Sequence, residues 1–186
     1  MGNNIGYLQS DRKNNELYTP MYAVDPIIKY LSKDKIIWCP FDEEWSAFNV
    51  RLKEENFKVV RSSLSEGKDF FEYEPDNWDL IVSNPPFSIK DKVLERLYSL
   101  SKPFAILLPL NSLQGQTRYK YFREGVQLLS FDKRICYHDS SHMDCVVSGS
   151  PFASAYFCRN LLPKDLIVER LELYNRSLLK EDFYDN

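Results

Sequence analysis

Short apolar runs alternate with longer amphipathic segments along the first two thirds of the chain. The length of these runs and their β-branched and aromatic content predict strands over 35–39, 56–60, 78–83 and 104–108. Apolar residues at helical spacing, bounded by Pro or Asn, predict helices over 25–31, 45–56 and 91–101. Alternating strands and helices with nearly continuous apolar strands are typical of a parallel sheet that is covered on both faces.

The last third of the chain has a different pattern. Residues 127–137 and 152–158 predict two strands with only a loop between them. A loop cannot provide the helical crossover that a parallel pair needs, so we predict that this pair is antiparallel. The six strands located here fit an α/β fold with a seven-stranded sheet, mostly parallel, and a C-terminal antiparallel hairpin. Ligands of such sheets bind at the carboxyl ends of the strands, so the residues that follow each strand are the candidates for chemistry.

Composition narrows the class of protein. A chain of 186 residues with 44% hydrophobic residues predicts a single globular domain over 1–186, in which the polar residues 1–16 form a flexible arm. No apolar run reaches the roughly 18 residues of a membrane span, and the N-terminus lacks a signal core. We therefore expect a cytoplasmic protein that does not contact the membrane. The net charge of −3 argues against a globally basic surface but leaves room for a local basic patch.

A metal site is not expected. The four cysteines form no C-x-x-C pair, and the chain has only two histidines. Both histidines lie in the segment 138–144 with H-x-x-x-H spacing, but this segment is rich in Ser and is predicted to be a loop rather than a helix. We expect this loop to cover a substrate.

The tetrapeptide Asn84-Pro85-Pro86-Phe87 directly follows the strand predicted over 78–83. Its two prolines fix φ and remove two backbone donors, so carbonyl groups here are held without being used in a helix. The Asn84 amide oxygen and a fixed carbonyl can together accept both hydrogens of one –NH₂ group, which makes the nitrogen a nucleophile. Phe87 can stack on the ring that carries the amine. We predict that these four residues form the catalytic site.

With this motif after such a strand, the chain resembles the S-adenosylmethionine-dependent amino-methyltransferases, whose Rossmann-like class I sheet carries an N/D-P-P-Y/F motif. It is most similar to the small DNA adenine-N6 methyltransferases of phages and prophages, from Leu17 to about Leu162. The resemblance implies S-adenosyl-L-methionine as cofactor and the N6 amino group of adenine as acceptor. It also implies that Asn84 and the Pro85 carbonyl hold the amino group, while Phe87 stacks on a flipped-out base.

On the cofactor side, family members carry D-P-F-x-G-x-G after the first strand. The run here is Cys-Pro-Phe-Asp-Glu-Glu-Trp-Ser over 39–46, which lacks the leading Asp and both glycines. Glycines let the backbone approach a cofactor closely, so side chains of this run must supply polar contacts instead. A Tyr-Thr-Pro element at 18–20 and an Asp-Phe pair at 69–70 also resemble the family. The implied cofactor-binding residues are Tyr18, Thr19, Pro20, Pro40, Phe41, Asp42, Ser46, Asp69 and Phe70.

The substrate side follows the fourth predicted strand. Asn111 is expected to line the base pocket, and residues 114–123 interleave aromatic with basic side chains, which suits phosphate contact and base stacking. The predicted substrate-binding residues are Phe87, Asn111, Arg118, Lys120 and Arg123. DNA is the favoured nucleic acid and RNA the second choice. Because no long insertion provides a recognition domain, sequence specificity is expected to be low or to come from a partner protein or a homodimer.

Two other interpretations of the sequence stay open. Within enzymes, adenine in RNA or the side-chain amide of glutamine in a protein presents the same –NH₂ chemistry, although Phe87 favours a base because many glutamine-modifying relatives carry Tyr there. Outside enzymes, the chain could be a non-catalytic nucleic-acid-binding relative that lost cofactor binding together with the glycines. A titration with the cofactor separates this binding protein from every enzyme.

Overall fold

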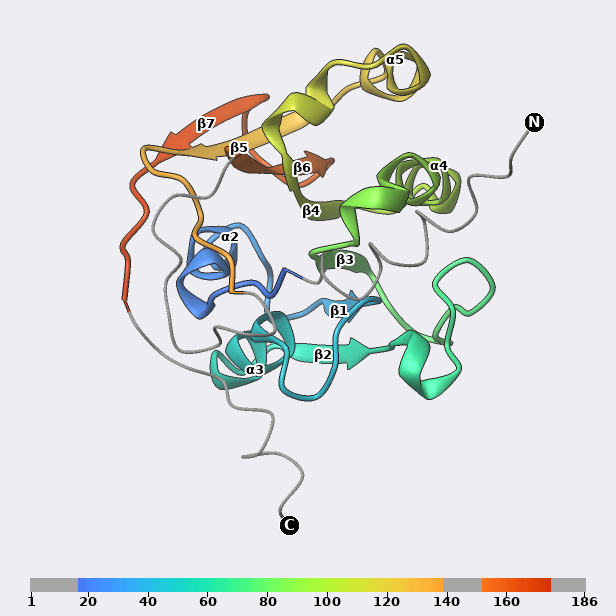
Figure 1. Cartoon of the computed structure of the whole chain (residues 1–186). Coiled ribbons are helices and arrows are strands. Elements are labelled where there is room, and N and C mark those ends of the chain that lie inside the picture. Colours follow the sequence, from blue (N-terminus) through green and yellow to red (C-terminus); the bar gives the residue numbers. More distant parts are fainter. Residues whose placement is uncertain (1–16, 139–151, 175–186) are drawn as a thin grey trace, which may run out of the picture.

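Seven strands form one sheet in the computed structural model, which describes residues 17–138 and 152–174 (Figure 1). The strands are β1 (Ile36–Cys39), β2 (Lys58–Arg61), β3 (Leu80–Ser83), β4 (Phe104–Pro109), β5 (Gln127–Phe131), β6 (Ser154–Arg159) and β7 (Leu166–Glu169). Their order across the sheet is β2-β1-β3-β4-β6-β5-β7. Strand β6 runs antiparallel to both of its neighbours, whereas the other described pairs are parallel.

Helices lie on both faces of this sheet. In Figure 1, α2 (Asp25–Ile28) and α3 (Ala47–Glu54) lie on one face and α4 (Lys90–Leu100) on the other, with α5 (Gln116–Phe122) next to α4. Short 3-10 helices connect these elements: η1 (Met21–Ala23), η2 (Leu64–Glu66), η3 (Phe87–Ile89) and η4 (Leu110–Leu113). No helix in the described part of the chain is long and apolar enough to cross a membrane.

The strands are apolar on both faces because each face has its own core. Ile37, Val82 and Leu107 pack with η1, α2 and α3, whereas their chain neighbours Trp38 and Ile81 pack with α4. Successive strand residues point to opposite faces, so a strand with helices on both sides must be apolar throughout. This arrangement explains why β3 and β4 are buried along their whole length.

The predicted α/β fold, with its mostly parallel seven-stranded sheet, is confirmed, and so is the predicted antiparallel pair, because the consecutive strands β5 and β6 pair antiparallel. The strand predicted over 127–137 ends at Phe131, because the chain then leaves the sheet and the Cys136 amide donates to the Tyr22 hydroxyl, 2.9 Å away. The sequence did not locate β7, which follows this pair along the chain and lies at the sheet edge beside β5. The expected arm over 1–16 lies outside the described residues.

Candidate active site

The predicted cofactor loop and the predicted catalytic tetrapeptide lie next to each other, because they follow the carboxyl ends of β1 and β3. These strands are parallel neighbours, with Trp38 paired to Ile81, so the loop after Cys39 lies beside the tetrapeptide after Ser83. The Ser83 hydroxyl joins the two loops directly, because it donates a hydrogen bond to the Asp42 carboxylate over 2.5 Å. Both residues are buried.

A pocket opens at this edge with about 560 Å³ of empty space, its mouth included. Predicted cofactor and catalytic residues line it together: Tyr18, Thr19, Pro20, Phe41, Asp42, Ser46 and Asn84. The other lining residues are Leu17, Met21, Trp45, Ala47 and His138, of which His138 begins the segment 138–144 that we expect to cover a substrate.

The N-terminal wall of the pocket is held by a pairing between distant segments. Tyr18 and His138 form a two-residue antiparallel bridge, in which the Tyr18 amide donates to the His138 carbonyl over 2.7 Å. The Tyr18 ring meets the Trp45 ring edge to face, with centroids 5.0 Å apart. This long-range pairing brings His138 into the pocket wall.

Side chains shape the loop at the two positions where the family pattern has glycine, which fall on Glu43 and Trp45. The Glu43 amide donates to the Ser46 hydroxyl over 2.8 Å, and the Ser46 amide donates to the Glu43 carbonyl over 3.1 Å. Trp45 is buried and lines the pocket. The loop therefore has an aromatic wall where glycines would expose the backbone.

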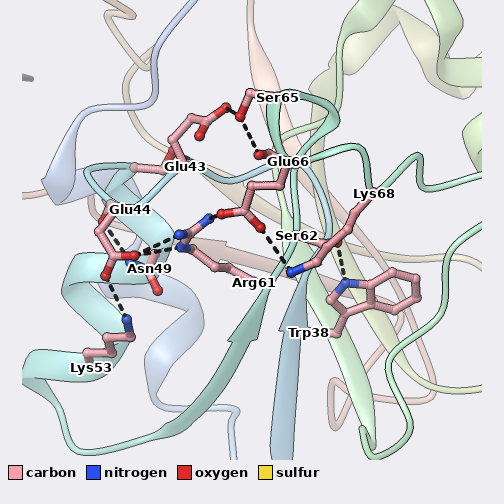
Figure 2. A network of polar contacts seen from close by, with 12 residues as sticks. Trp38, Glu43, Glu44, Asn49, Lys53, Arg61, Ser62, Ser65, Glu66 and Lys68 are labelled. Atoms are coloured by element: carbon pink, nitrogen blue, oxygen red, sulfur yellow. Dashed lines mark hydrogen bonds and ion pairs between the residues drawn. The ribbon is translucent and has the colours of Figure 1, made fainter.

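A polar network fixes this loop to the end of β2 (Figure 2). The Arg61 guanidinium donates to the Glu44 carboxylate through Nε and Nη2, at 2.9 and 2.8 Å, and also pairs with Glu66. The Ser65 hydroxyl donates to the Glu43 carboxylate over 2.8 Å. Arg61 holds the pKa of the Glu44 carboxyl below its usual range, so the network is charged near neutral pH. Because its groups are partly exposed, we expect it to orient the loop more than to stabilise the fold.

Asp42 is the buried carboxylate of the pocket. Desolvation raises the pKa of its carboxyl to about 7, and the hydrogen bond from Ser83 only partly opposes this rise. Its side chain therefore changes charge near neutral pH, which is common for ionisable groups at functional sites.

The side-chain amide of Asn84 contains a hydrogen-bond acceptor that receives no hydrogen bond from the described residues. Its side-chain oxygen is buried and has no hydrogen-bond partner in the described part of the chain, although Asn84 lines the pocket. A buried carbonyl oxygen left without a partner costs about 1–3 kcal/mol, so a ligand donor at this place would be favourable. Beside it, the Pro86 carbonyl accepts from the Ile89 amide, whereas the described hydrogen bonds leave the Pro85 carbonyl unused.

Phe87 belongs to an aromatic cluster that the sequence did not predict. Its ring meets Tyr137 and Phe152 edge to face, at centroid distances of 6.0 and 5.6 Å. Tyr137 and Phe152 lie on either side of residues 139–151, which are outside the described part of the chain and include most of the loop that we expect to cover a substrate. Phe87 is half buried and does not belong to the pocket lining, so its contact with a base stays a prediction.

The remaining cofactor residues lie outside the pocket lining. Pro40 is buried, and the Phe70 ring packs in the core against Trp38 while also meeting the pocket residue Phe41 at 4.8 Å. The Asp69 carboxylate accepts from the Phe71 amide over 3.0 Å. The assignment of Pro40, Asp69 and Phe70 to cofactor binding stays a prediction.

The predicted substrate residues after β4 are spread over η4 and α5. Asn111, Lys120 and Arg123 are exposed. Arg118 instead holds α5 in place, because its guanidinium donates to Asp91 over 2.6 Å and to the Ser112 carbonyl over 2.7 Å. The role of these residues in substrate binding stays a prediction. The described residues contain no group of His, Cys, Asp and Glu that could hold a metal ion.

Comparisons with known proteins address the fold. No protein-family model and no curated protein matches the sequence. The comparison with solved structures shows that the chain has a methyltransferase-like fold. It is similar to the methyltransferase subunit of a type I restriction-modification system from Streptococcus thermophilus, with 13% sequence identity and a TM-score of 0.50. The match covers 96% of this chain and 53% of that chain, so the chain spans about half the length of this structure.

Proposed function

We propose that the protein transfers a methyl group from S-adenosylmethionine to the N6 amino group of adenine in DNA. The observation that carries this proposal is the buried, unpartnered oxygen of Asn84 in a pocket shared with the loop after β1. Such an oxygen is matched by an N–H donor, and it lies in the motif whose chemistry is the activation of an amine.

The residues of the pocket fit the proposed cofactor. The pocket walls are aromatic at Tyr18, Phe41 and Trp45, and Asp42 offers a negative charge. When bound, S-adenosylmethionine supplies a methyl group activated by a positively charged sulfur, so no strong base is required.

The chain's own residues then act by positioning. Asn84 and the Pro85 carbonyl accept the two N–H groups of the adenine amine, which turns its lone pair toward the pocket. Phe87 contacts the base, with Tyr137 and Phe152 supporting the Phe87 ring. When the methyl donor and the amine are held in fixed positions, the loss of translational and rotational freedom occurs on binding. The reaction step itself then has a lower barrier.

The choice of DNA is supported by the likeness to a restriction-modification methyltransferase subunit and by the exposed basic residues Lys120, on α5, and Arg123, directly after it. The test is incubation with S-adenosylmethionine labelled in its methyl group, followed by measurement of label in DNA, RNA and protein. We expect label in DNA with the wild type and a loss of roughly 10²-fold with Asn84→Ala. Label in protein alone would refute the proposed substrate, and no label in any of the three would favour a non-catalytic protein.

A further inference from the structure

Asp42 is a buried charge whose presence the fold does not explain. Its side chain lines the pocket and is 4% exposed, yet the described residues place no salt bridge on it. Its hydrogen-bond partner is the neutral hydroxyl of Ser83. A buried carboxylate without a counter-charge is costly in free energy, so a ligand that brings a positive charge would be stabilised here.

The elements around Asp42 do not provide that positive charge. Arg61, at the end of β2, acts on Asp42 only from a distance, because Glu44 and Glu66 take up its guanidinium. The other ionisable groups that act on Asp42 are Cys39 on β1, Glu43 on its own loop and Tyr156 on β6. Tyr18 and His138 also line the pocket.

The position of Asp42 indicates which part of a ligand it would meet. Ser83, to which it is hydrogen bonded, directly precedes Asn84, the residue that holds the acceptor amine under the proposed function. A methyl group must be delivered to that amine, so the charged sulfur that carries it must lie near these residues. Cys39 cannot take this role, because it is fully buried and does not line the pocket.

We infer that Asp42 supplies the counter-charge for the sulfonium group of the methyl donor, so that the pocket selects the charged donor over the neutral thioether that remains after transfer. This inference rests on the proposed function and goes beyond it, because it assigns the discrimination between donor and product to one side chain. Asp42 is thus a specificity-determining residue.

Protonation of Asp42 should accordingly compete with the donor. Because burial raises the pKa of Asp42 to about 7, the free pocket holds a proton at pH 6 that it has lost at pH 8. If one proton with this pKa must leave before the donor binds, the affinity for S-adenosylmethionine is about tenfold lower at pH 6 than at pH 8. Since His138 also lines the pocket, the pH dependence is assigned to Asp42 only by comparison with a variant.

The experiment is calorimetric titration of the whole chain with S-adenosylmethionine and with S-adenosylhomocysteine, its thioether counterpart, at pH 8 and pH 6. The wild type is expected to prefer the sulfonium ligand by about tenfold at pH 8. Asp42→Asn keeps the side-chain shape and an acceptor for Ser83 but removes the charge. It is expected to abolish both the preference and the tenfold loss at pH 6.

Asp76→Asn is the matched control, because it makes the same Asp-to-Asn change at an exposed side chain that does not line the pocket. It is expected to keep the wild-type preference and pH dependence. Circular dichroism checks that both variants are folded.

Two results contradict the inference in different ways. If Asp42→Asn lowers the affinity for both ligands by the same factor, or for neither, Asp42 does not face the sulfonium group, and the proposed function stands without the inference. If the folded wild type binds neither ligand, the proposed function itself fails and the inference with it.

Discussion

Replacing Asp42 with Asn should make the fold more stable, and by an amount that depends on pH. The pKa of Asp42 rises from 3.8 in the unfolded chain to about 7 in the folded protein, because the pocket desolvates its carboxylate. Between these two values the folded state binds more protons than the unfolded state. The contribution of Asp42 to stability is therefore fully present below pH 3.8 and is lost as the pH rises through about 7.

The size of the effect follows from the two pKa values. A difference of one pKa unit corresponds to about 1.4 kcal/mol, so the shift of about three units costs the wild type about 4 kcal/mol at pH 8 relative to acid. Asn has the same shape and does not titrate. We expect the free energy of unfolding of Asp42→Asn to match that of the wild type near pH 4 and to exceed it by about 4 kcal/mol at pH 8. This is a large fraction of the 5–15 kcal/mol that stabilises a typical domain.

The assay is urea unfolding followed by tryptophan fluorescence at a series of pH values, for the wild type, Asp42→Asn and Asp76→Asn. The unsubstituted carboxylates are common to all three proteins, so the difference between curves isolates the substituted group. Asp76→Asn, at an exposed side chain, should change stability by less than about 0.5 kcal/mol at every pH. Parallel curves for the wild type and Asp42→Asn from pH 4 to pH 8 would refute the reasoning, since Asp42 would then be ionised in the folded protein throughout.

Three further predictions concern the reaction and its supporting residues. Asn84→Ala should lower turnover roughly 10²-fold with cofactor affinity nearly unchanged, and wild-type turnover would mean that the tetrapeptide is only a turn. Phe87→Ala should weaken substrate binding by about 1–3 kcal/mol, measured as KM against kcat, while Phe87→Tyr retains part of it; an effect on kcat alone would contradict stacking. Arg61→Ala should lower cofactor affinity severalfold in calorimetry and stability by no more than about 1 kcal/mol, because its ion pairs orient the cofactor loop; a loss of stability alone would contradict this role.

The fold could be predicted where each segment carries its own signal. The apolar runs at β3 and β4 are buried on both faces, so their composition alone indicates strands inside a covered sheet. Strand β7 carries no such signal, since it has four residues at the sheet edge and its Leu166 and Val168 are exposed. The end of β5 depends on a contact between Cys136 and Tyr22, which local patterns cannot reveal.

The candidate site likewise combines features that the sequence predicted with contacts that it could not predict. Asp42 and Asn84 follow neighbouring strands, so the rule that ligands bind at carboxyl ends was enough to expect them in one pocket. Arg118 has a basic side chain in a basic segment, and nothing in that pattern indicated that Asp91 would hold it. The contacts of Phe87 with Tyr137 and Phe152 also join segments far apart in the chain.

The most direct test of the proposed reaction is the identity of its product. Unmethylated DNA is incubated with S-adenosylmethionine and either the wild type or Asn84→Ala, then digested to nucleosides and analysed by mass spectrometry. The account predicts N6-methyladenine with the wild type, at a rate roughly 10²-fold above that of the variant. Methylation found only on cytosine, or N6-methyladenine formed at equal rates by both proteins, would contradict it.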